Sequence, residues 1–319
     1  MVFSSFMFIW IFLPATWAIH TFLHRINIKI ANYFLFVASI FFYAWGEPVY
    51  VLLMLFSILW NYLWGMKLVT RNRFSLVLCI AGNLMLLGYF KYSGMMIDTI
   101  NRIFSANITQ RNIPLPIGIS FYTFQALSYV IDVYRGESQA SKNPFELGLY
   151  ISLFPQLIAG PIVKYKDVAE QIGCRSITLD KTAEGIRRFL YGLAKKVLIA
   201  NTLALTVDKI YDLNVAELSS AAAWVGALFY TLQIYYDFSG YSDMAIGLGK
   251  MLGFSFQENF NLPYTSCSVS EFWRRWHISL GAWFRDYVYI PLGGSRKGTL
   301  KTCRNLMIIF FLTGLWHGA

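Results

Sequence analysis

Long apolar stretches, separated by short polar connections, run along almost the whole chain. A helix needs about 20 mostly apolar residues to cross a bilayer, and many of these stretches approach that length. They cover residues 2–19, 30–46, 49–66, 74–92, 115–131, about 147–163, 186–206, 221–236, 240–256 and 305–319. The pattern predicts an all-α, polytopic integral membrane protein with about 8–10 transmembrane or re-entrant helices.

One apolar stretch is interrupted. In FPQLIAGPIV, residues 154–163, the helix breakers Pro155, Gly160 and Pro161 divide an otherwise apolar run. Interrupted backbone is tolerated at membrane depth only where protein or an internal cavity covers its polar groups. The stretch is therefore predicted to be a re-entrant segment that lines an interior path.

Basic residues predict the orientation. They cluster in loops 20–29 and 67–73, whereas the connection at 46–48 has no Lys or Arg. The positive-inside rule places these two loops in the cytoplasm and the N-terminus outside. A predicted external loop at 91–114 departs from this rule because it is also basic. Its basic residues are Lys91, Arg102 and Arg111.

The composition supports one membrane domain over residues 1–319. The chain is 56% hydrophobic and only 14% charged, whereas soluble domains carry about 25% charged residues. The net charge of +10 is spread over short clusters between apolar stretches, which argues against a nucleic-acid partner. Four cysteines without a C-x-x-C pair, and four histidines in all, give no basis for a disulfide framework or a metal site.

An aromatic and basic segment near the end of the chain is a candidate site. Treated as one helix, residues 271–287 carry an aromatic face that includes Trp276 and an opposite face with Arg274 and Arg275. This pattern is typical of an amphipathic interfacial helix. His277 is expected near the boundary between the faces. From position alone, a hydrogen-bonded interfacial histidine is favoured over a catalytic one.

A second histidine, His317, ends the apolar stretch 305–319. An ionisable residue in such a run is costly to bury and is a candidate functional residue. Gly314 and Gly318 lie near it, so a ligand or a second helix has room to approach closely. The residues alone leave open whether His317 is catalytic or a hydrogen-bonded structural histidine.

Two acidic residues lie in the apolar stretch YYDFSGYSDMAIGLG, residues 235–249. Asp237 is a candidate helix cap with Ser239, and Asp243 is a candidate partner for an arginine of 271–287. Structural roles are favoured for both. Two acids and a histidine also fit a proton relay, so a transporter remains an alternative.

Five stretches resemble the membrane-bound O-acyltransferase family, and within it the branch that acetylates alginate and other exported polysaccharides. The stretches are LPIGISFYTFQALSYVIDVYRG (115–136), FPQLIAGPIVKY (154–165), YYDFSGYSDMAIGLGKMLGF (235–254), SVSEFWRRWHISLGAWFRDYVYIPLGGSR (268–296) and LTGLWHGA (312–319). A sister branch that transfers D-alanine to teichoic acids has a similar Trp-His stretch. The PLGG segment at 291–294 fits the polysaccharide branch better.

The resemblance implies a ring of helices around a tunnel and assigns the site. His317 is implied to be the catalytic histidine, and His277 a second catalytic-site residue. Family members continue through further helices beyond this histidine, so the 319-residue chain is expected to be incomplete at its C-terminus. Substrate-binding roles are expected for the basic and tryptophan residues beside the two histidines: Arg274, Arg275, Trp276 and Trp316.

The implied reaction is acetyl transfer in the bacterial inner (cytoplasmic) membrane. Acetyl-CoA or another acetyl thioester is the expected donor, with no bound cofactor and no metal, and His317 acts as general base. The acceptor is an alginate-like exported polysaccharide, reached through an outward-facing acetyl-acceptor or transferase partner protein. D-alanyl or other acyl transfer to cell-wall polymers, and a non-catalytic acyl or proton transporter, are the alternatives.

Overall fold

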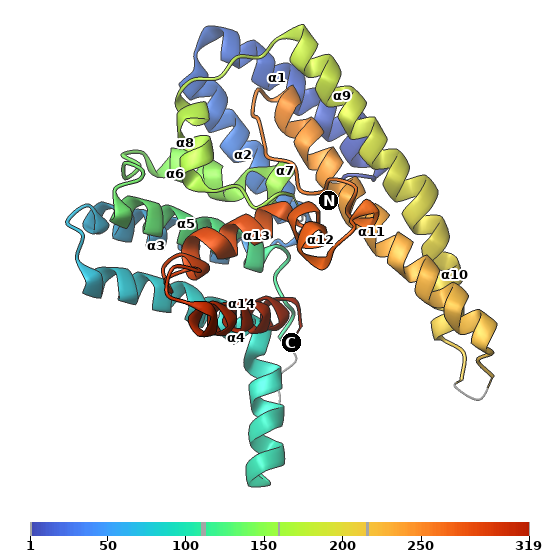
Figure 1. Ribbon diagram of the computed structural model, residues 1–319. Coiled ribbons are helices and arrows are strands. Elements are labelled where there is room, and N and C mark those ends of the chain that lie inside the picture. Colours follow the sequence, from blue (N-terminus) through green and yellow to red (C-terminus); the bar gives the residue numbers. More distant parts are fainter. Residues whose placement is uncertain (1, 110–112, 159, 215–216, 319) are drawn as a thin grey trace. The chain divides into compact units, whose positions relative to one another are not determined.

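The described part of the protein is built from helices. The computed structural model describes residues 2–109, 113–158, 160–214 and 217–318, and it contains no strand among them (Figure 1). Four of the described helical segments are long and apolar enough to cross a bilayer. They are α2 (Ile28–Gly46), α3 (Val51–Leu68), α4 (Arg73–Phe104) and the rod Leu179–Tyr211. These segments confirm the prediction of an all-α, polytopic membrane protein.

The remaining elements are shorter or interrupted. The rod consists of α9 (Leu179–Ala194), a π-helical turn η2 (Lys195–Ala200) and α10 (Asn201–Tyr211). The other elements, in chain order, are η1 (Phe8–Phe12), α1 (Leu13–Ile26), α5 (Ile119–Arg135), α6 (Pro144–Ser152), α7 (Phe154–Leu157), α8 (Tyr165–Gly173), α11 (Ser220–Met251), η3 (Pro263–Thr265), α12 (Val269–Arg275), α13 (Ile278–Phe284), η4 (Arg285–Tyr289) and α14 (Thr299–His317).

Two compact units draw on interleaved segments of the chain. Unit 1 comprises Met1–Ala31, Ala159–Pro161 and Cys174–Ile278, and unit 2 comprises Asn32–Ile158, Ile162–Gly173 and Ser279–Ala319. Unit 1 therefore holds α1, the α9–α10 rod, α11 and α12. Most of α2, the helices α3 to α8, α14 and nearly all of α13 belong to unit 2. The single domain over residues 1–319 stays a prediction.

Unit 1 is organised by close packing of α11 against the α9–α10 rod (Figure 1). Glycines face one another at the contact. A Cβ atom added at Gly185 would lie 2.6 Å from the Gly247 carbonyl oxygen, and one added at Gly240 would lie 2.8 Å from the Gly192 carbonyl oxygen. Small residues of this kind let two helix backbones approach closely inside a membrane. The glycines therefore set the distance between the two helices.

The predicted separate stretches at 221–236 and 240–256 are wrong, because α11 runs without a break from Ser220 to Met251. Asp237 lies inside this helix and pairs with Lys196, so it does not cap a helix end. Asp243 accepts hydrogen bonds from Arg188 (2.8 Å) and Lys195 (2.6 Å), and not from an arginine of 271–287. Ion pairs across the helix contact therefore neutralise both acids.

The interruption predicted at 154–163 is present. The short helix α7 follows a break at Leu153, and no helix covers residues 160–164; Ala159 lies outside the described residues. Serine hydroxyls accept hydrogen bonds from backbone N–H groups in and around this interruption. The pairs are Phe154 N with Ser39 (3.2 Å), Ile162 N with Ser279 (3.0 Å) and Tyr165 N with Ser128 (3.3 Å). Protein atoms thus cover the irregular backbone, as a membrane interior requires.

Unit 2 has an aromatic core where α5 meets α13 and η4. The Trp283 ring stacks on the Phe124 ring with centroids 4.1 Å apart, and the Trp283 indole N–H donates to the Phe124 carbonyl oxygen at 3.1 Å. The other members of the buried cluster are Leu127, Ile162, Leu280, Phe284 and Tyr287. This packing fixes α13 along α5, because stacking and a hydrogen bond act on the same side chain.

Charged residues close the edge of this core. Lys164 pairs with Asp286 (2.5 Å), and the exposed Arg285 also binds Asp286 (2.9 Å). Partial burial alone would raise the pKa of the Asp286 carboxyl, but these hydrogen bonds outweigh burial and hold the pKa below its ordinary value. The Tyr287 hydroxyl donates to the buried Asp132 at 2.8 Å. Together these bonds attach η4 to α5 and to the segment before α8.

Alanine at Gly192 tests the close approach of α9 and α11. Its Cβ atom would clash with the Gly240 carbonyl and lie 2.6 Å from the Met244 nitrogen. Gly192→Ala should lower the free energy of unfolding by about 1–3 kcal/mol, as overpacking usually does. Gly88→Ala is the control, because a Cβ atom there meets nothing within 4 Å. Thermal unfolding in detergent measures both, and equal midpoints would contradict the packing described.

Lys164→Met should destabilise unit 2, because it removes the main partner of a half-buried carboxylate. A loss of about 1–3 kcal/mol is expected, less than for a buried charge left without any partner, because Arg285 still binds Asp286. Since the pKa of Asp286 is depressed, the pairing is complete above about pH 4 and is lost as the pH falls. The difference in unfolding midpoint between wild type and Lys164→Met should therefore shrink in acid. A difference independent of pH would mean that packing of the lysine stem causes the effect.

Candidate functional site

His277 lies at a break between two helices of the 268–289 segment. The predicted single helix over 271–287 is wrong, because Trp276 is extended and His277 has a left-handed φ of 45°. The backbone here bonds to the preceding segment instead. Ile278 N donates to the Asn259 carbonyl, and Asn261 N donates to the Arg275 carbonyl, each at 2.9 Å. These two bonds replace the helical bonds that would have continued α12.

The His277 side chain is buried, with 3% of its surface exposed. The predicted position at a helix face boundary is therefore wrong. Its Nδ1 lies 3.1 Å from the Asn259 side-chain oxygen, and its ring meets the Phe238 ring edge-on at 4.7 Å. Because an amide oxygen only accepts hydrogen bonds, Nδ1 carries the proton. The neutral ring then has its acceptor nitrogen at Nε2.

Trp276 and the two arginines surround this histidine in sequence but differ in environment. The Trp276 ring packs against Phe260 (5.1 Å) and Phe272 (5.6 Å). Arg275 binds Glu271 at 2.6 Å, whereas Arg274 is exposed. The backbone N–H of Cys267, with Arg275 beside it, holds the pKa of Glu271 below its ordinary value. Arg275 is thus engaged within its own helix, and Arg274 presents its charge to the surface.

His317 belongs to unit 2, so this half of the candidate site is described by itself. It is the last residue of α14 and is exposed in this chain. The rings of Trp316 and His317 meet at 4.6 Å, and the Trp316 ring stacks on Phe124 at 5.6 Å. The end of α14 is therefore joined to the aromatic core through Trp316.

Two residues of α4 bind the end of α14. Lys91 donates to the Trp316 carbonyl oxygen, and the Tyr92 hydroxyl donates to the Leu315 carbonyl oxygen at 2.9 Å. The last carbonyls of a helix have no partner within it, and cations favour this end. Lys91 also lies 5.4 Å from the centre of the Trp316 ring and interacts electrostatically with His317. The two hydrogen bonds thus fix the backbone that carries the histidine.

Lys91, Tyr92 and Asn259 were missed as site residues from the sequence. The predicted loop at 91–114 is wrong up to Phe104, since α4 includes both Lys91 and Arg102; Arg111 lies outside the described residues. The available signal was a lysine inside the apolar run 74–92, one residue before its end. A lysine at the end of such a run is normally interpreted as a loop residue, because its partner is a backbone carbonyl far away in the sequence.

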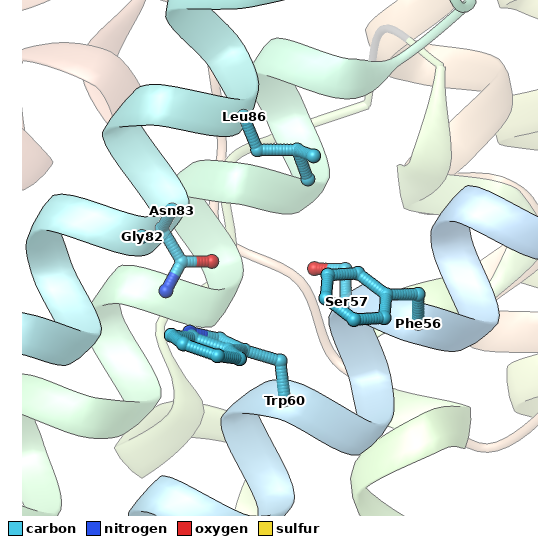
Figure 2. Close-up of a pocket in the computed structure, with 6 residues that line it drawn as sticks. All are labelled: Phe56, Ser57, Trp60, Gly82, Asn83 and Leu86. Carbon is cyan, nitrogen blue, oxygen red and sulfur yellow. The ribbon is translucent and has the colours of Figure 1, made fainter.

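A small pocket of about 90 Å³ lies between α3 and α4 (Figure 2). Phe56, Trp60 and Leu86 form its apolar wall, and Ser57 and Asn83 its polar part. Asn83 and Asn61 exchange hydrogen bonds of 2.9 and 3.0 Å. None of the predicted site residues lines it. Among the described residues, no group of three His, Cys, Asp or Glu side chains comes together as a metal site.

Comparison with known proteins gives a consistent result. The model of the membrane-bound O-acyltransferase family matches residues 132–319. The probable alginate O-acetylases of Pseudomonas putida and Pseudomonas aeruginosa are 46% and 47% identical over the whole chain, which covers 67% and 62% of their lengths. The peptidoglycan O-acetyltransferase of Helicobacter pylori is 35% identical, again over the whole chain and 67% of that protein. The chain thus spans about two thirds of the length of the relatives it matches.

The matched region contains both histidines and the helices that hold them. The family model covers more than half of the chain, from the buried Asp132 of α5 to the end of α14. The apolar helices and the broken segment at 154–163 fit a membrane-embedded protein of this kind. The chain belongs to the membrane-bound O-acyltransferase family.

Proposed function

We propose that the full-length protein is an O-acetyltransferase of the bacterial inner membrane. It transfers acetyl from a cytoplasmic thioester, most simply acetyl-CoA, toward hydroxyl groups of an exported, alginate-like polysaccharide. The observation that carries the proposal is His317 at the end of an apolar helix, with the preceding carbonyls bound by Lys91 and Tyr92. The names of the most similar proteins support acyl transfer to a polymer.

His317 acts as the general base in this mechanism. Its imidazole takes the proton of an acceptor hydroxyl while the hydroxyl oxygen attacks the thioester carbonyl. When the tetrahedral intermediate collapses, the carbon–sulfur bond breaks and the imidazolium returns the proton to the leaving sulfur. Positioned proton transfer of this kind contributes about 10²–10⁴-fold to a rate. Lys91 and Tyr92 of α4, which bind the carbonyls that precede His317, position the imidazole.

His277 orients the acceptor. With the proton on Nδ1 and bound to Asn259, Nε2 of the neutral ring can accept a hydrogen bond from a hydroxyl group but cannot donate one. An oxyanion needs a donor, so the neutral tautomer suits the acceptor hydroxyl better than the developing oxyanion. The buried aromatic surroundings keep this ring in one orientation.

The donor is a substrate, and the mechanism uses no bound cofactor. Arg274 is the exposed cation available for the phosphates of a thioester donor, with Arg275 beside it in an ion pair. The flat rings of Trp276 and Trp316 offer apolar surface for the rest of the donor or acceptor. A separate outward-facing partner protein, itself an acetyl acceptor or transferase, completes delivery to the polysaccharide.

The transporter alternative depends on acids that are available to carry protons. Asp243 is instead bound by Arg188 and Lys195, and Asp237 by Lys196. Their positions at the α9–α11 contact favour a structural role.

His317→Ala in the full-length protein tests the function directly. The acetate released by mild alkali from the exported polymer should fall by at least about 100-fold, because the general base is lost. Thr313→Ala is the control, since Thr313 lies one turn earlier in α14 and bonds only to the Ile309 carbonyl among the described residues. Both variants must reach the membrane equally. Unchanged acetate in His317→Ala would exclude the proposed base and favour the transporter.

Asn259→Leu tests the orientation of His277. Loss of this hydrogen bond should lower the acetylation rate by about tenfold, the equivalent of roughly 1.4 kcal/mol. Asn259→Asp keeps an oxygen acceptor for Nδ1 and should retain more activity than Asn259→Leu. Initial rates at equal protein levels give the comparison. Equal rates for the two variants would mean that the Asn259 side chain does not act through His277.

A further inference from the structure

Several side chains of unit 2, Asn32 and Trp60 among them, leave buried polar atoms unpaired, and four of these side chains are almost completely buried. Tyr43, Tyr122, Gln125 and Gln156 are each no more than 3% exposed. Within the described part of the chain, no hydrogen bond reaches the hydroxyls of Tyr43 and Tyr122, either amide atom of Gln125, or Oε1 of Gln156. Buried polar groups are nearly always paired. Five unpaired atoms in these four residues therefore need an explanation.

Two of these residues lie on one face of α5. Gly118, Tyr122 and Gln125 follow one another at intervals of four and three residues, so they line up along the helix. A Cβ atom at Gly118 would lie 2.7 Å from the Leu157 carbonyl oxygen, which places this face of α5 against α7. Gln156 precedes Leu157 in α7. The face with Tyr122 and Gln125 is thus directed toward the interrupted segment.

Tyr150 links the two glutamines. Its hydroxyl lies 2.9 Å from the Val163 carbonyl and 3.2 Å from the backbone carbonyl of Gln125, and its own carbonyl accepts from Gln156 Nε2 at 2.5 Å. Gln156 is therefore held by one amide atom, and its other amide atom, Oε1, is left for another partner. Gln125 uses only its backbone here, so its whole side-chain amide is available.

The fourth residue comes from the adjacent end of α2. Ser39 accepts a hydrogen bond from Phe154 N, and the Phe42 and Phe154 rings lie 5.5 Å apart. Tyr43 follows Phe42 directly, and its phenol is within electrostatic range of Tyr122. Helices α2, α5 and α7 therefore bring the two tyrosines and two glutamines to the same part of unit 2.

The chemistry of this group fits the neutral hydroxyl groups of a ligand, and the carboxylates of an alginate-like acceptor would have to lie outside it. Two phenol hydroxyls and two amides can donate and accept hydrogen bonds, and the group itself carries no charge. An anionic ligand such as a phosphate would need a cation or several N–H donors. Hydroxyl groups of a sugar or amides of a thioester arm match the free atoms. Either would supply the missing bonds in a region with little other polar surface.

The position of the group favours the acceptor over the donor. Tyr43 lies three residues before the end of α2 at Gly46, and Ile117 N, just before α5, binds Glu47 at 3.4 Å. The connection at 46–48 lacks Lys and Arg, so the positive-inside rule places this end of α2 and α5 outside. A ligand that enters from the outer side is the hydroxyl-bearing acceptor.

We propose that Tyr43, Tyr122, Gln125 and Gln156 form a binding site for the hydroxyl groups of the acetyl acceptor. This inference rests on the proposed function and adds the residues that bind the acceptor, separate from the histidines. Binding there supplies the hydrogen bonds that the folded protein leaves unmade. Residues whose polar atoms are unpaired until a ligand binds contribute to the affinity for the acceptor and not to the free energy of unfolding.

The proposal can be tested because it predicts a change in acceptor affinity without a loss of stability. Gln125→Leu, an apolar replacement of similar size, removes unpaired atoms only, so the unfolding midpoint should stay the same or rise. The apparent KM for acceptor should increase about tenfold, and Tyr122→Phe should act in the same direction. The assay uses right-side-out membrane vesicles from the native host that carry the full-length protein, so that the proposed partner protein is also present. The acceptor is exported polymer stripped of acetate by alkali, and acetyl-CoA inside the vesicles is varied separately.

Controls separate the possible outcomes. Asn83→Leu removes a paired amide and should lower the unfolding midpoint, in contrast to Gln125→Leu. His317→Ala shows whether the measured acetylation is the proposed reaction at all. If acetylation depends on His317 but Gln125→Leu raises the KM for acetyl-CoA, or changes neither KM, the acceptor site is refuted while the function stands. A lowered midpoint in Gln125→Leu would show a structural role and also refute the site.

Discussion

Satisfaction of backbone hydrogen bonds within an apolar environment is the constraint on which this structure depends. Water is absent from the bilayer interior, so each interruption of a helix needs a protein partner. The breaks occur where the chain carries its candidate chemistry. Ser39, Ser128 and Ser279 bind N–H groups around the 154–163 interruption. Lys91 and Tyr92 bind the carbonyls that precede His317, and Asn259 takes the N–H beside His277.

These partners have a second effect. A side chain that binds a backbone group also fixes the position of the neighbouring residues, here the candidate histidines. Lys91 belongs to α4 and the carbonyl it binds belongs to α14, so the bond is tertiary and holds His317 relative to α4. The backbone bond at Asn259 goes with a side-chain bond to His277 Nδ1. One residue thus sets both the left-handed backbone at the helix break and the tautomer of the ring. Local structure and candidate chemistry are determined by the same few contacts.

The fold class was predictable from the sequence, because it depends on the length and hydropathy of helices, which are local properties. The break at 154–163 was predictable for the same reason, since Pro155 and Pro161 act on their own backbone. The break at His277 was not, because Asn259 and Asn261, far back in the chain, bind the backbone there. The partner of Asp237 inside α11 is also a distant residue, Lys196. His277 and His317 were candidates from their positions and the resemblance favoured a catalytic role for both, whereas their partners are visible only in the structure.

The polar groups of unit 2 fall into two classes with different consequences. Asn61 and Asn83 hydrogen-bond to each other between α3 and α4, and Lys164 binds Asp286 of η4. Such pairs stabilise the folded unit, and their polar groups are then no longer available to a ligand. Tyr43, Tyr122, Gln125 and Gln156 retain unmet capacity after folding. An apolar interior penalises that capacity, and in these four residues it lies beside the interrupted segment, where a bound ligand could use it.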